Sequence, residues 1–374
     1  MSLTAVGDLV PDVGKVAVLR ANALGDFLFA IPALEALRAA YPKAEIVLLA
    51  RDWHAGFVPR RLPAVDRVVV VPNAVGIWAP PGQEADDAEL DRFFARMAEE
   101  RFDVGLQLHG GGRNSNPFVR RLEARVTAGP RTPDAEPLDR WFTYVYYQAE
   151  IFRLLEAVAL VGAAPVCLEP RLTVVEADRE EAAEHLGGAG PFVALHPGAT
   201  DARRRWPPAC FAAVGDALAD AGARVLVTGS AEEAEVVDAV VARMEAPAIA
   251  LAGALSTGGL AGALARCSVA VSNDTGPLHL AAAVGAATVG IFWCGNLINA
   301  GPITRHRHRP SISWRLDCPA CGTNCITGEC DHEDSFVADI PLEEVRTSAL
   351  DLLATAHRAG DGQDPDRLAR AATR

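Results

Sequence analysis

Short apolar runs of strand length alternate with helical segments along almost the whole chain, and this alternation restricts the fold more than any other feature. The clearest unit combines an apolar run at Cys267–Ser272, a polar turn at Asn273–Gly276, a small-residue helix reaching Gly285 and a second apolar run at Ala287–Phe292. Runs that are apolar throughout indicate strands covered on both faces. The sequence therefore predicts an α/β fold in which helices cover parallel sheets.

The alternation occurs in both halves of the chain and predicts two domains. In the first half we expect strands at Lys15–Arg20, Ala44–Ala50, Val68–Val71 and Val104–Leu108, a helix at Asp26–Ala40 and one long helix at Leu138–Gly162. In the second half we expect strands at Phe192–His196 and Arg224–Thr228 and helices at Ala209–Ala221, Ala231–Met244 and Leu342–Arg358. These elements predict doubly wound, Rossmann-like domains at 1–165 and 166–358 that face a central cleft, followed by a disordered tail at 359–374.

The composition narrows the class of protein. The chain has 374 residues and a net charge of -13, which excludes a general nucleic-acid surface. Lys15 and Lys43 are its only lysines, so nearly all positive charge is carried by Arg. No signal peptide and no membrane-spanning run is visible, and eight cysteines are too few for a disulfide scaffold in so long a chain. These features predict a cytoplasmic protein and leave a peripheral contact at the inner membrane face open.

The loops that follow the expected strands carry the candidate functional residues, because ligands of doubly wound sheets bind at the carboxyl ends of strands. The loop after the first strand contains Asn22 and Asp26, and the loop after the fourth strand begins at His109 and contains Arg113. Asp26 is either a helix cap or a general base, and His109 is either functional or an ordinary surface residue. No Gly-x-Gly-x-x-Gly or Walker sequence follows the first strand, which argues against a dinucleotide oxidoreductase and a P-loop enzyme.

Loops in the second half predict an anion site. Arg203–Arg205 come soon after the strand that ends at His196, and three guanidiniums beside Trp206 favour phosphate binding over a purely structural loop. Asp274–Gly276 form a helix N-terminus that either binds phosphate or is simply capped. A second cluster, at Arg305, Arg307 and Arg309, favours a solvated loop. The remaining candidates in the loops after strands are Gly198, Thr200, Gly229, Ser230 and Glu233.

Four cysteines lie close together before the last expected helix, at Cys318, Cys321, Cys325 and Cys330. Four close thiols suit a tetrahedral structural zinc, although the second and third intervals are longer than the usual Cys-x-x-Cys spacing. A local disulfide pair and reduced thiols are the alternatives. The nearby His332 is expected to be a surface residue.

Three longer motifs follow one another along the chain. They are Leu24-Gly25-Asp26 through Ile31-Pro32-Ala33-Leu34, then His196-Pro197-Gly198 with a basic residue before Trp206-Pro207, and finally Asn273-Asp274-Thr275-Gly276-Pro277-Leu278-His279. In this order and spacing they resemble the motifs of glycosyltransferase family 9, the heptosyltransferase family of lipopolysaccharide assembly. The resemblance covers roughly Lys15 to Leu353. It implies a GT-B fold and an inverting, metal-independent transfer from a nucleotide sugar.

The resemblance also implies roles for individual residues. Asp26 corresponds to the proposed base, and Arg204 stands where the family has a Lys that contacts the donor phosphate. Asp274–Gly276 and His279 fall in the donor site, and Glu233 falls where a ribose contact is expected. The chain departs from the family at Trp293–Asn296, where Gly, Thr and Pro are usual. This departure leaves the nucleotide base of the donor open.

These observations together predict an enzyme that moves a heptose-like sugar from a nucleotide-diphosphate donor, ADP-heptose by resemblance, to a glycan or glycolipid hydroxyl. Asn22, His109 and Arg113 are expected on the acceptor side. No catalytic cofactor is expected, because the only Asp-x-Asp sequence, Asp364-Pro365-Asp366, lies in the tail. The alternatives are a GT-B-like sugar-nucleotide epimerase or hydrolase and a non-catalytic nucleotide-sugar binding protein.

Overall fold

The computed structural model describes residues 7–79 and 84–360, and the chain divides into two compact units. The N-terminal unit is Met1–Val175 with Ile298–Ala300, and the C-terminal unit is Glu176–Leu297 with Gly301–Arg374. The exact domain bounds 1–165 and 166–358 stay a prediction. From residue 361 onward, the expected tail lies outside the described residues.

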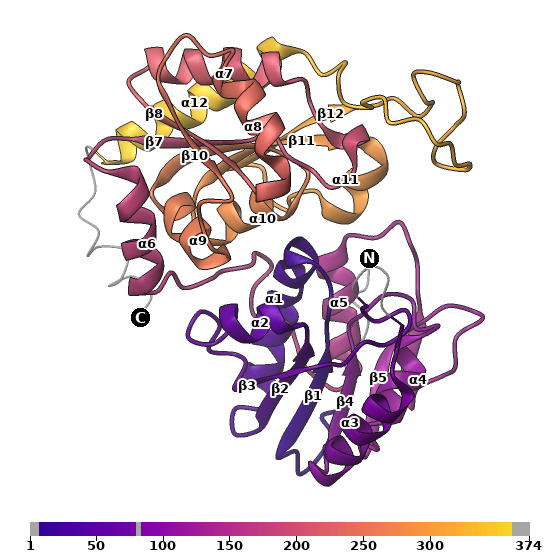
Figure 1. The fold of residues 1–374 in the computed structure, drawn as a ribbon. Coiled ribbons are helices and arrows are strands. Elements are labelled where there is room, and N and C mark those ends of the chain that lie inside the picture. The colour runs from indigo at the N-terminus through magenta and orange to yellow at the C-terminus, as the bar shows by residue number, and fades with distance from the viewer. Residues whose placement is uncertain (1–6, 80–83, 361–374) are drawn as a thin grey trace. The chain divides into compact units, whose positions relative to one another are not determined.

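The N-terminal unit contains a parallel sheet of six strands in the order β3-β2-β1-β4-β5-β6 (Figure 1). Helix α1 begins at Leu24, two residues before the predicted start, and packs against α5. The strands are β1 (Lys15–Leu19), β2 (Glu45–Ala50), β3 (Arg67–Val70), β4 (Val104–Gln107), β5 (Val126–Arg131) and β6 (Arg140–Thr143). The helices are α1 (Leu24–Ala40), α2 (Asp52–Phe57), α3 (Asp87–Glu99), α4 (Ser115–Arg120) and α5 (Glu150–Ala159).

The C-terminal unit repeats this design with a parallel sheet in the order β12-β11-β10-β7-β8-β9. Helices α7 and α12 cover one face, and α9 and α10 cover the other (Figure 1). The strands are β7 (Phe192–His196), β8 (Arg224–Gly229), β9 (Ala248–Ala252), β10 (Cys267–Asn273), β11 (Ala287–Trp293) and β12 (His308–Ser313). The helices are α6 (Glu176–Leu186), α7 (Pro208–Asp220), α8 (Ala234–Val241), α9 (Thr257–Ala265), α10 (Gly276–Ala283), α11 (Cys294–Ala300) and α12 (Leu342–Gly360), with short 3₁₀ turns at Ala202–Arg204 and Ala231–Glu233.

Both sheets have the strand order 3-2-1-4-5-6 of a dinucleotide-binding Rossmann sheet. The N-terminal sheet has this order directly, and the C-terminal sheet has it when β7 is counted as its first strand. In such a sheet the order reverses between the first and fourth strands, and ligands bind beyond the carboxyl ends of these two strands. The switch points lie between β1 and β4 and between β7 and β10. The loops that follow these four strands contain most of the predicted site residues.

The prediction of one long helix at Leu138–Gly162 is wrong. Residues Arg140–Thr143 form the edge strand β6, and the helix begins only at Glu150. The start of the segment contains Trp141, Phe142 and Thr143, and aromatic and β-branched residues fit a pleated surface better than a helix. The apolar periodicity of α5 therefore begins at Glu150 and does not reach back to Leu138.

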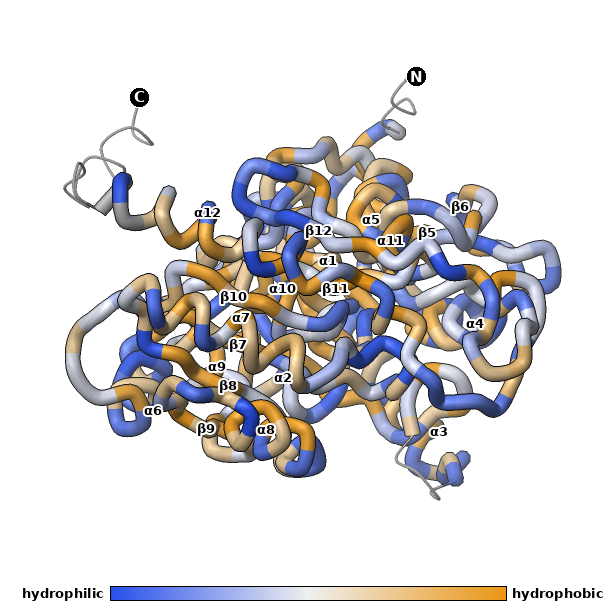
Figure 2. Tube along the Cα trace, turned by 90° about the horizontal axis from the view of Figure 1, so that it is seen from above, coloured by the Kyte–Doolittle hydropathy of each residue, from blue (hydrophilic) through white to orange (hydrophobic). Residues whose placement is uncertain are grey.

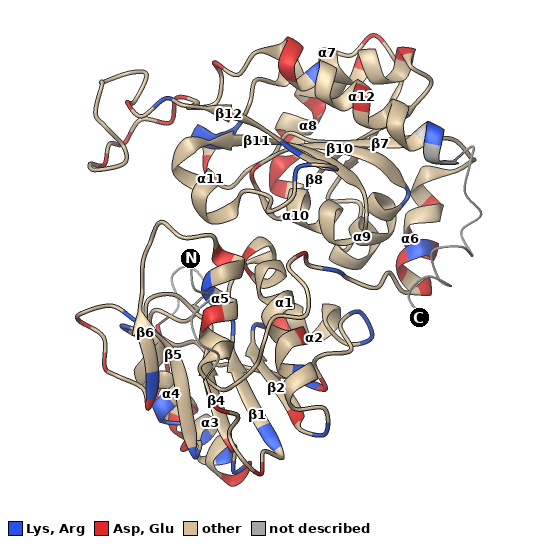
Figure 3. Cartoon of the chain, turned by 180° about the vertical axis from the view of Figure 1, so that it is seen from behind, with Lys and Arg blue, Asp and Glu red and all other residues tan. Residues whose placement is uncertain are grey.

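The cores follow from the apolar strands. Hydrophobic residues gather along β10 and β11 in Figure 2, and charged residues lie mainly on helices and loops in Figure 3. The central strands β7, β10 and β11 carry no Lys, Arg, Asp or Glu. Within the described ranges, no helix is both long and apolar enough to cross a membrane.

One buried histidine makes the stability of the N-terminal unit sensitive to acid. His54 on α2 is fully buried, and its ring stacks on Trp53 with 3.6 Å between ring centroids. Burial, together with the charges of Arg51 and Arg20, lowers the pKa of His54 from 6.5 to about 3. As the pH falls below 6.5, His54 is protonated in the unfolded chain but stays neutral in the folded protein. The contribution of neutral His54 to the free energy of unfolding is therefore fully present above pH 6.5 and is lost as the pH falls toward 3.

We therefore expect the wild-type protein to lose about 2 kcal/mol of unfolding free energy between pH 7 and pH 5 through His54 alone, at ~1.4 kcal/mol per pH unit once the pH is below 6.5. His54→Leu should lack this part of the loss. Urea unfolding of both proteins at the two pH values measures the difference. Equal losses in wild type and variant would show that His54 is not held neutral.

Candidate functional site

Asn273, the last residue of β10, joins two of the predicted loops of the C-terminal unit. Its side chain is fully buried. The Oδ1 atom accepts a hydrogen bond from the backbone N–H of Trp206 at 3.0 Å, and the Nδ2 atom donates to the carbonyl of Pro197 at 2.8 Å. The indole of Trp206 is also buried and donates to the Ile340 carbonyl at 3.1 Å. These contacts fix the loop after β7 against the end of β10.

The three consecutive arginines of that loop have different surroundings. Arg203 makes a two-point ion pair with Asp201, with N–O distances of 2.9 and 2.8 Å, and this contact lowers the pKa of the Asp201 carboxyl. Arg205 donates to the Ala199 carbonyl at 2.9 Å. Arg204 instead reaches the turn after β10, where its Nη1 lies 3.3 Å from the carbonyl and 3.7 Å from a carboxylate oxygen of Asp274. The buried Nε of Arg204 has no hydrogen-bond partner within the described part of the chain.

The turn after β10 leads into helix α10 at the switch point. Thr275 occupies the N-cap position in an extended conformation, and its side chain makes no capping hydrogen bond. The interpretation of Asp274 or Thr275 as a side-chain cap is therefore wrong. The carboxylate of Asp274 is buried and lies between Arg204 and His279, whose Nε2 is 3.3 Å away. The N-terminus of α10 and the guanidinium of Arg204 thus lie on the same side of the C-terminal unit, as an anion site requires.

A second polar group lies beside the same switch point. His196, at the end of β7, is buried, and its Nδ1 lies 3.0 Å from the hydroxyl of Thr228. Because that hydroxyl donates to the Leu195 carbonyl, we assign the ring proton to Nδ1. Burial lowers the pKa of His196, although the Glu233 carboxylate, 3.7 Å from Nε2, and the Thr228 backbone oppose the shift. His196 is therefore neutral at pH 7.

Glu233 and the glycine of the second motif fit closely together. A Cβ atom on Gly198 would lie only 2.1 Å from Oε1 of Glu233, so this position accepts no larger residue unless Glu233 moves. The other oxygen of Glu233 accepts the N–H of Ser230 at 2.9 Å within a capping box. Among the described residues, Oε1 accepts no hydrogen bond. Gly229 and Thr200 lie in the same two loops.

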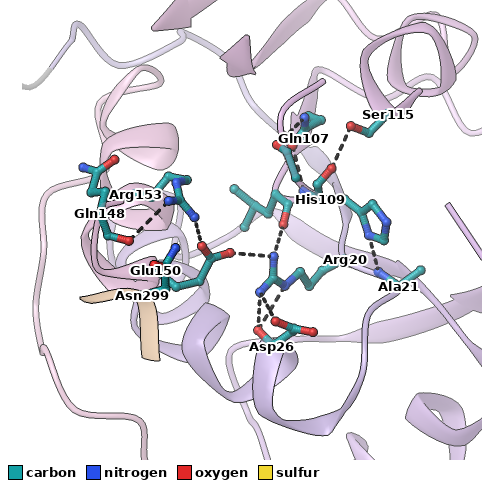
Figure 4. Close-up of polar contacts among 12 residues, drawn as sticks. Arg20, Ala21, Asp26, Gln107, His109, Ser115, Gln148, Glu150, Arg153 and Asn299 are labelled. Carbon is teal, nitrogen blue, oxygen red and sulfur yellow. Dashed lines mark hydrogen bonds and ion pairs between the residues drawn. The ribbon is translucent and has the colours of Figure 1, made fainter. Parts of the chain in front are cut away.

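In the N-terminal unit, a buried arginine positions Asp26 (Figure 4). Arg20 follows β1 directly and is 1% exposed. Its Nε donates to the backbone carbonyl of Asp26 at 3.0 Å, and its Nη1 donates to the Leu108 carbonyl at 2.6 Å and to Glu150 at 3.1 Å. Glu150 also pairs with Arg153. The network holds the first turn of α1 against the end of β4. Nothing in the sequence pattern singles out Arg20, Glu150 or Arg153.

The Asp26 side chain itself is about half exposed, with 48% of its surface accessible, and its nearest carboxylate oxygen lies 3.9 Å from Arg20. The N-cap residue of α1 is Ala23, so Asp26 is in the first turn and does not cap the helix. The helix-cap alternative is therefore wrong. An exposed carboxylate at the carboxyl end of β1 is available to a substrate hydroxyl, which a general base requires.

The three predicted acceptor-side residues share one cavity. It has a volume of about 390 Å³ and is lined by Asn22, Gly110–Ser115 and Tyr144, among others. His109 also lines it, but its Nδ1 accepts the Ala21 N–H at 3.2 Å and the residue is buried, so the alternative of a surface residue is wrong. Burial and the charge of Arg20 lower the pKa of His109 to about 4. Arg113 is largely exposed at the rim, 3.7 Å from Asp134.

The cysteine loop brings together a set of possible metal ligands that differs from the predicted one. The ligand atoms of Cys318, Cys321, Cys330 and His332 all lie within 4.8 Å of one another. Cys325 lies beside this group, with its sulfur 3.9 Å from that of Cys330. His332 was missed because its spacing from Cys330, with a single residue between them, matches no common zinc pattern.

In the second arginine cluster, Arg305, Arg307 and Arg309, two of the three side chains contact other parts of the C-terminal unit. Arg307 donates to the Gly285 carbonyl, and Arg309 pairs with Asp351 at 2.5 Å. Arg305 is exposed. The structure therefore favours Arg203–Arg205 over Arg305–Arg309 as an anion site.

Comparison with known proteins agrees with this arrangement. The family model described as glycosyltransferase family 9 (heptosyltransferase) matches residues 90–320. Lipopolysaccharide heptosyltransferase 1 of Pseudomonas aeruginosa is 28% identical, over 88% of this chain and 92% of that protein. The family 9 glycosyltransferase of Veillonella parvula has a TM-score of 0.77 at 20% identity, over 93% of this chain and 100% of that one. The ADP-heptose lipopolysaccharide heptosyltransferase II of Escherichia coli has a TM-score of 0.73 at 20% identity, over 92% and 99%. The predicted fold of two Rossmann-like domains, GT-B, is thereby confirmed.

Proposed function

Because the chain belongs to glycosyltransferase family 9, we propose that this enzyme transfers a heptose-like sugar from a nucleotide-diphosphate donor to a hydroxyl of a glycan or glycolipid, with inversion and without a catalytic metal. ADP-heptose is the proposed donor, since the E. coli relative is an ADP-heptose heptosyltransferase. A lipopolysaccharide precursor is the proposed acceptor, since the P. aeruginosa relative is a lipopolysaccharide heptosyltransferase. A glycolipid acceptor would bring the enzyme to the cytoplasmic face of a membrane as a peripheral protein.

The observation that carries this proposal is the placement of Arg204 beside the N-terminus of α10. When the glycosidic bond to the donor breaks, negative charge develops on the leaving diphosphate. A guanidinium and the N-terminus of a helix stabilise that charge without reorganising during the reaction. Asp274 balances the charge of Arg204 before the donor binds. His196, Gly198, Thr200, Gly229, Ser230, Thr275, Gly276 and His279 complete the proposed donor site, in which Glu233 binds the ribose.

The proposed acceptor side lies in the N-terminal unit. Asp26 removes the proton from the attacking hydroxyl, which then bonds to the sugar carbon on the side opposite the diphosphate, so the anomeric configuration inverts. Asn22 and Arg113 contact the acceptor in the 390 Å³ cavity. His109, which is neutral and bonded to the Ala21 N–H, shapes this cavity without taking part in proton transfer.

The experiment that tests the function combines purified enzyme, ADP-heptose and a lipopolysaccharide precursor lacking heptose. We expect an acceptor product of opposite anomeric configuration to the donor, identified by mass spectrometry and NMR. Release of free sugar without the acceptor would indicate a hydrolase, and a new nucleotide sugar would indicate an epimerase. Donor binding without any product would indicate a binding protein.

The transfer rate should be unchanged after a brief treatment with EDTA, because the proposed charge stabilisation uses Arg204 and backbone N–H groups where other transferases use a metal held by carboxylates. The measurement is the initial rate with EDTA, with added Mg²⁺ and with neither. A rate that EDTA abolishes and Mg²⁺ restores would contradict the metal-independent mechanism. A metal held by the cysteine loop would, in this proposal, have a structural role only.

A further inference from the structure

The segment between β12 and α12 is long, and it is anchored near its end by the buried residues Phe336, Val337 and Ile340. No helix or strand is present between Trp314 and Pro341, and both Trp314 and Leu316 are exposed. A loop of this length without its own secondary structure is uncommon in a compact domain unless something else orders it. The cysteine group lies in the middle of this loop.

The cysteine group has the geometry of a tetrahedral metal site. A zinc ion with bonds of ~2.3 Å to sulfur and ~2.0–2.1 Å to nitrogen separates its ligand atoms by roughly 3.5–3.8 Å. The four ligand atoms of Cys318, Cys321, Cys330 and His332 are already within 4.8 Å of one another. Shifts of about 1 Å would therefore complete the coordination.

A tight turn, Cys318-Pro319-Ala320-Cys321-Gly322, carries the first two cysteines. Gly322 has a φ of +73° and donates its N–H to the Cys318 carbonyl at 2.9 Å, which closes the turn. The turn thereby keeps the sulfurs of Cys318 and Cys321 within 4.8 Å of each other, close enough to bind one metal ion.

The fifth candidate is used differently. The sulfur of Cys325 lies 3.3 Å from the carbonyl of Thr323 and is oriented to donate a hydrogen bond to it. This sulfur is also not among the four ligand atoms that lie within 4.8 Å of one another. The imidazole of His332, in contrast, belongs to the mutually close group. We propose that the loop binds one structural Zn²⁺ through Cys318, Cys321, Cys330 and His332, and that Cys325 is not a ligand.

The zinc site is connected to the arginine loop through the residues that follow it. The hydroxyl of Ser335 donates to the Arg205 carbonyl at 2.6 Å, and the N–H of Phe336 donates to the Arg203 carbonyl at 2.7 Å. His332 precedes Ser335 by three positions. By fixing His332, zinc restrains the segment that holds Arg204 in place. This consequence rests on the proposed role of Arg204 in donor binding, whereas the zinc site itself does not.

The test begins with the metal content of the full-length protein purified without added metal. We expect about one equivalent of zinc in the wild type and also in Cys325→Ser, because this variant keeps all four proposed ligands. His332→Ala should release zinc to a competing chelator at least ~10-fold faster, since loss of even an outer-shell partner costs 10–100-fold in affinity. Cobalt substitution should give a tetrahedral spectrum with the charge-transfer intensity of three thiolates in both wild type and Cys325→Ser.

Several results would overturn the assignment. The first three are a zinc content below roughly a tenth of an equivalent, a disulfide found by mass spectrometry of the unreduced protein, and tightly held iron in place of zinc. The fourth is that Cys325→Ser loses its zinc while His332→Ala retains it. Zinc-depleted wild type should also melt at a lower temperature and show a raised KM for the donor with a nearly unchanged kcat. Metal content needs no substrate, so failure of the zinc site and failure of the proposed function remain distinguishable. Normal zinc content with an unchanged donor KM after depletion would remove only the link to Arg204.

Discussion

Asp26→Asn is expected to slow sugar transfer by ~10²–10⁴-fold, the range usual for loss of a general base, while leaving donor affinity nearly unchanged. Asparagine keeps the shape of the side chain and the first turn of α1, but it cannot accept the proton of the acceptor hydroxyl. The measurement is kcat in the transfer assay, together with the donor dissociation constant from calorimetry.

A matched control separates catalysis from helix stability. Asp87 is also an exposed acidic residue in the first turn of a helix of the N-terminal unit, α3, and it has no role in the proposed site. Asp87→Asn should lose the same small helix-dipole interaction, about 0.3–1 kcal/mol, with normal turnover. Near-normal turnover in Asp26→Asn would leave Asp26 as an ordinary first-turn carboxylate and remove it from the mechanism.

The environment of Asp26 explains why its carboxylate is well placed for this role. Arg20 contacts the Asp26 backbone more closely than the carboxylate, at 3.0 Å against 3.9 Å. The carboxylate of Glu150 forms an ion pair with Arg20 and partly neutralises its charge. The arginine therefore fixes the position of the first turn of α1 and leaves the carboxylate accessible from solvent.

The fold could be predicted because its strands are apolar on both faces. Runs such as Phe192–His196 and Cys267–Ser272 have few polar residues, and this pattern rarely occurs outside sheets covered by helices. Once the strands are known, the segments at their carboxyl ends follow, and these segments contain Asp26, His109, Arg204 and Asp274. The sequence could not give the edge strand β6, because an edge strand beside an amphipathic helix has no clear periodicity of its own.

Residues that act through distant contacts could not be selected from the sequence. Arg20 and Glu150 are 130 positions apart, and either residue alone resembles an ordinary charged side chain. Asn273 stands in a recognised motif, but its contacts with Pro197 and Trp206 become visible only when three loops are brought together. The spacing of His332 from Cys330 matches no common zinc pattern, and only the folded loop brings its imidazole close to the sulfur of Cys318.

Arg204→Ala is expected to weaken binding of the nucleotide-diphosphate donor by about 10- to 150-fold, which corresponds to the ~1.5–3 kcal/mol of a hydrogen bond to a charged group. Arg203 and Arg205 are engaged by Asp201 and by the Ala199 carbonyl, whereas Arg204 has an unpartnered Nε among the described residues and an Nη1 at the turn before α10. Calorimetric titration with ADP measures the effect on the diphosphate directly and requires no acceptor.

Two further variants test whether a loss of ADP affinity in Arg204→Ala reflects a direct contact between Arg204 and the diphosphate. Arg204→Lys keeps the charge and restores the residue usual in the family, so it should recover part of the affinity, although lysine lacks the planar, two-point geometry of a guanidinium. Arg305→Ala removes a cation from the exposed second cluster and should leave ADP affinity as it is in the wild type. If Arg305→Ala weakens ADP binding and Arg204→Ala does not, the donor phosphates bind at the Arg305–Arg309 cluster, and the charge stabilisation assigned to the N-terminus of α10 is wrong.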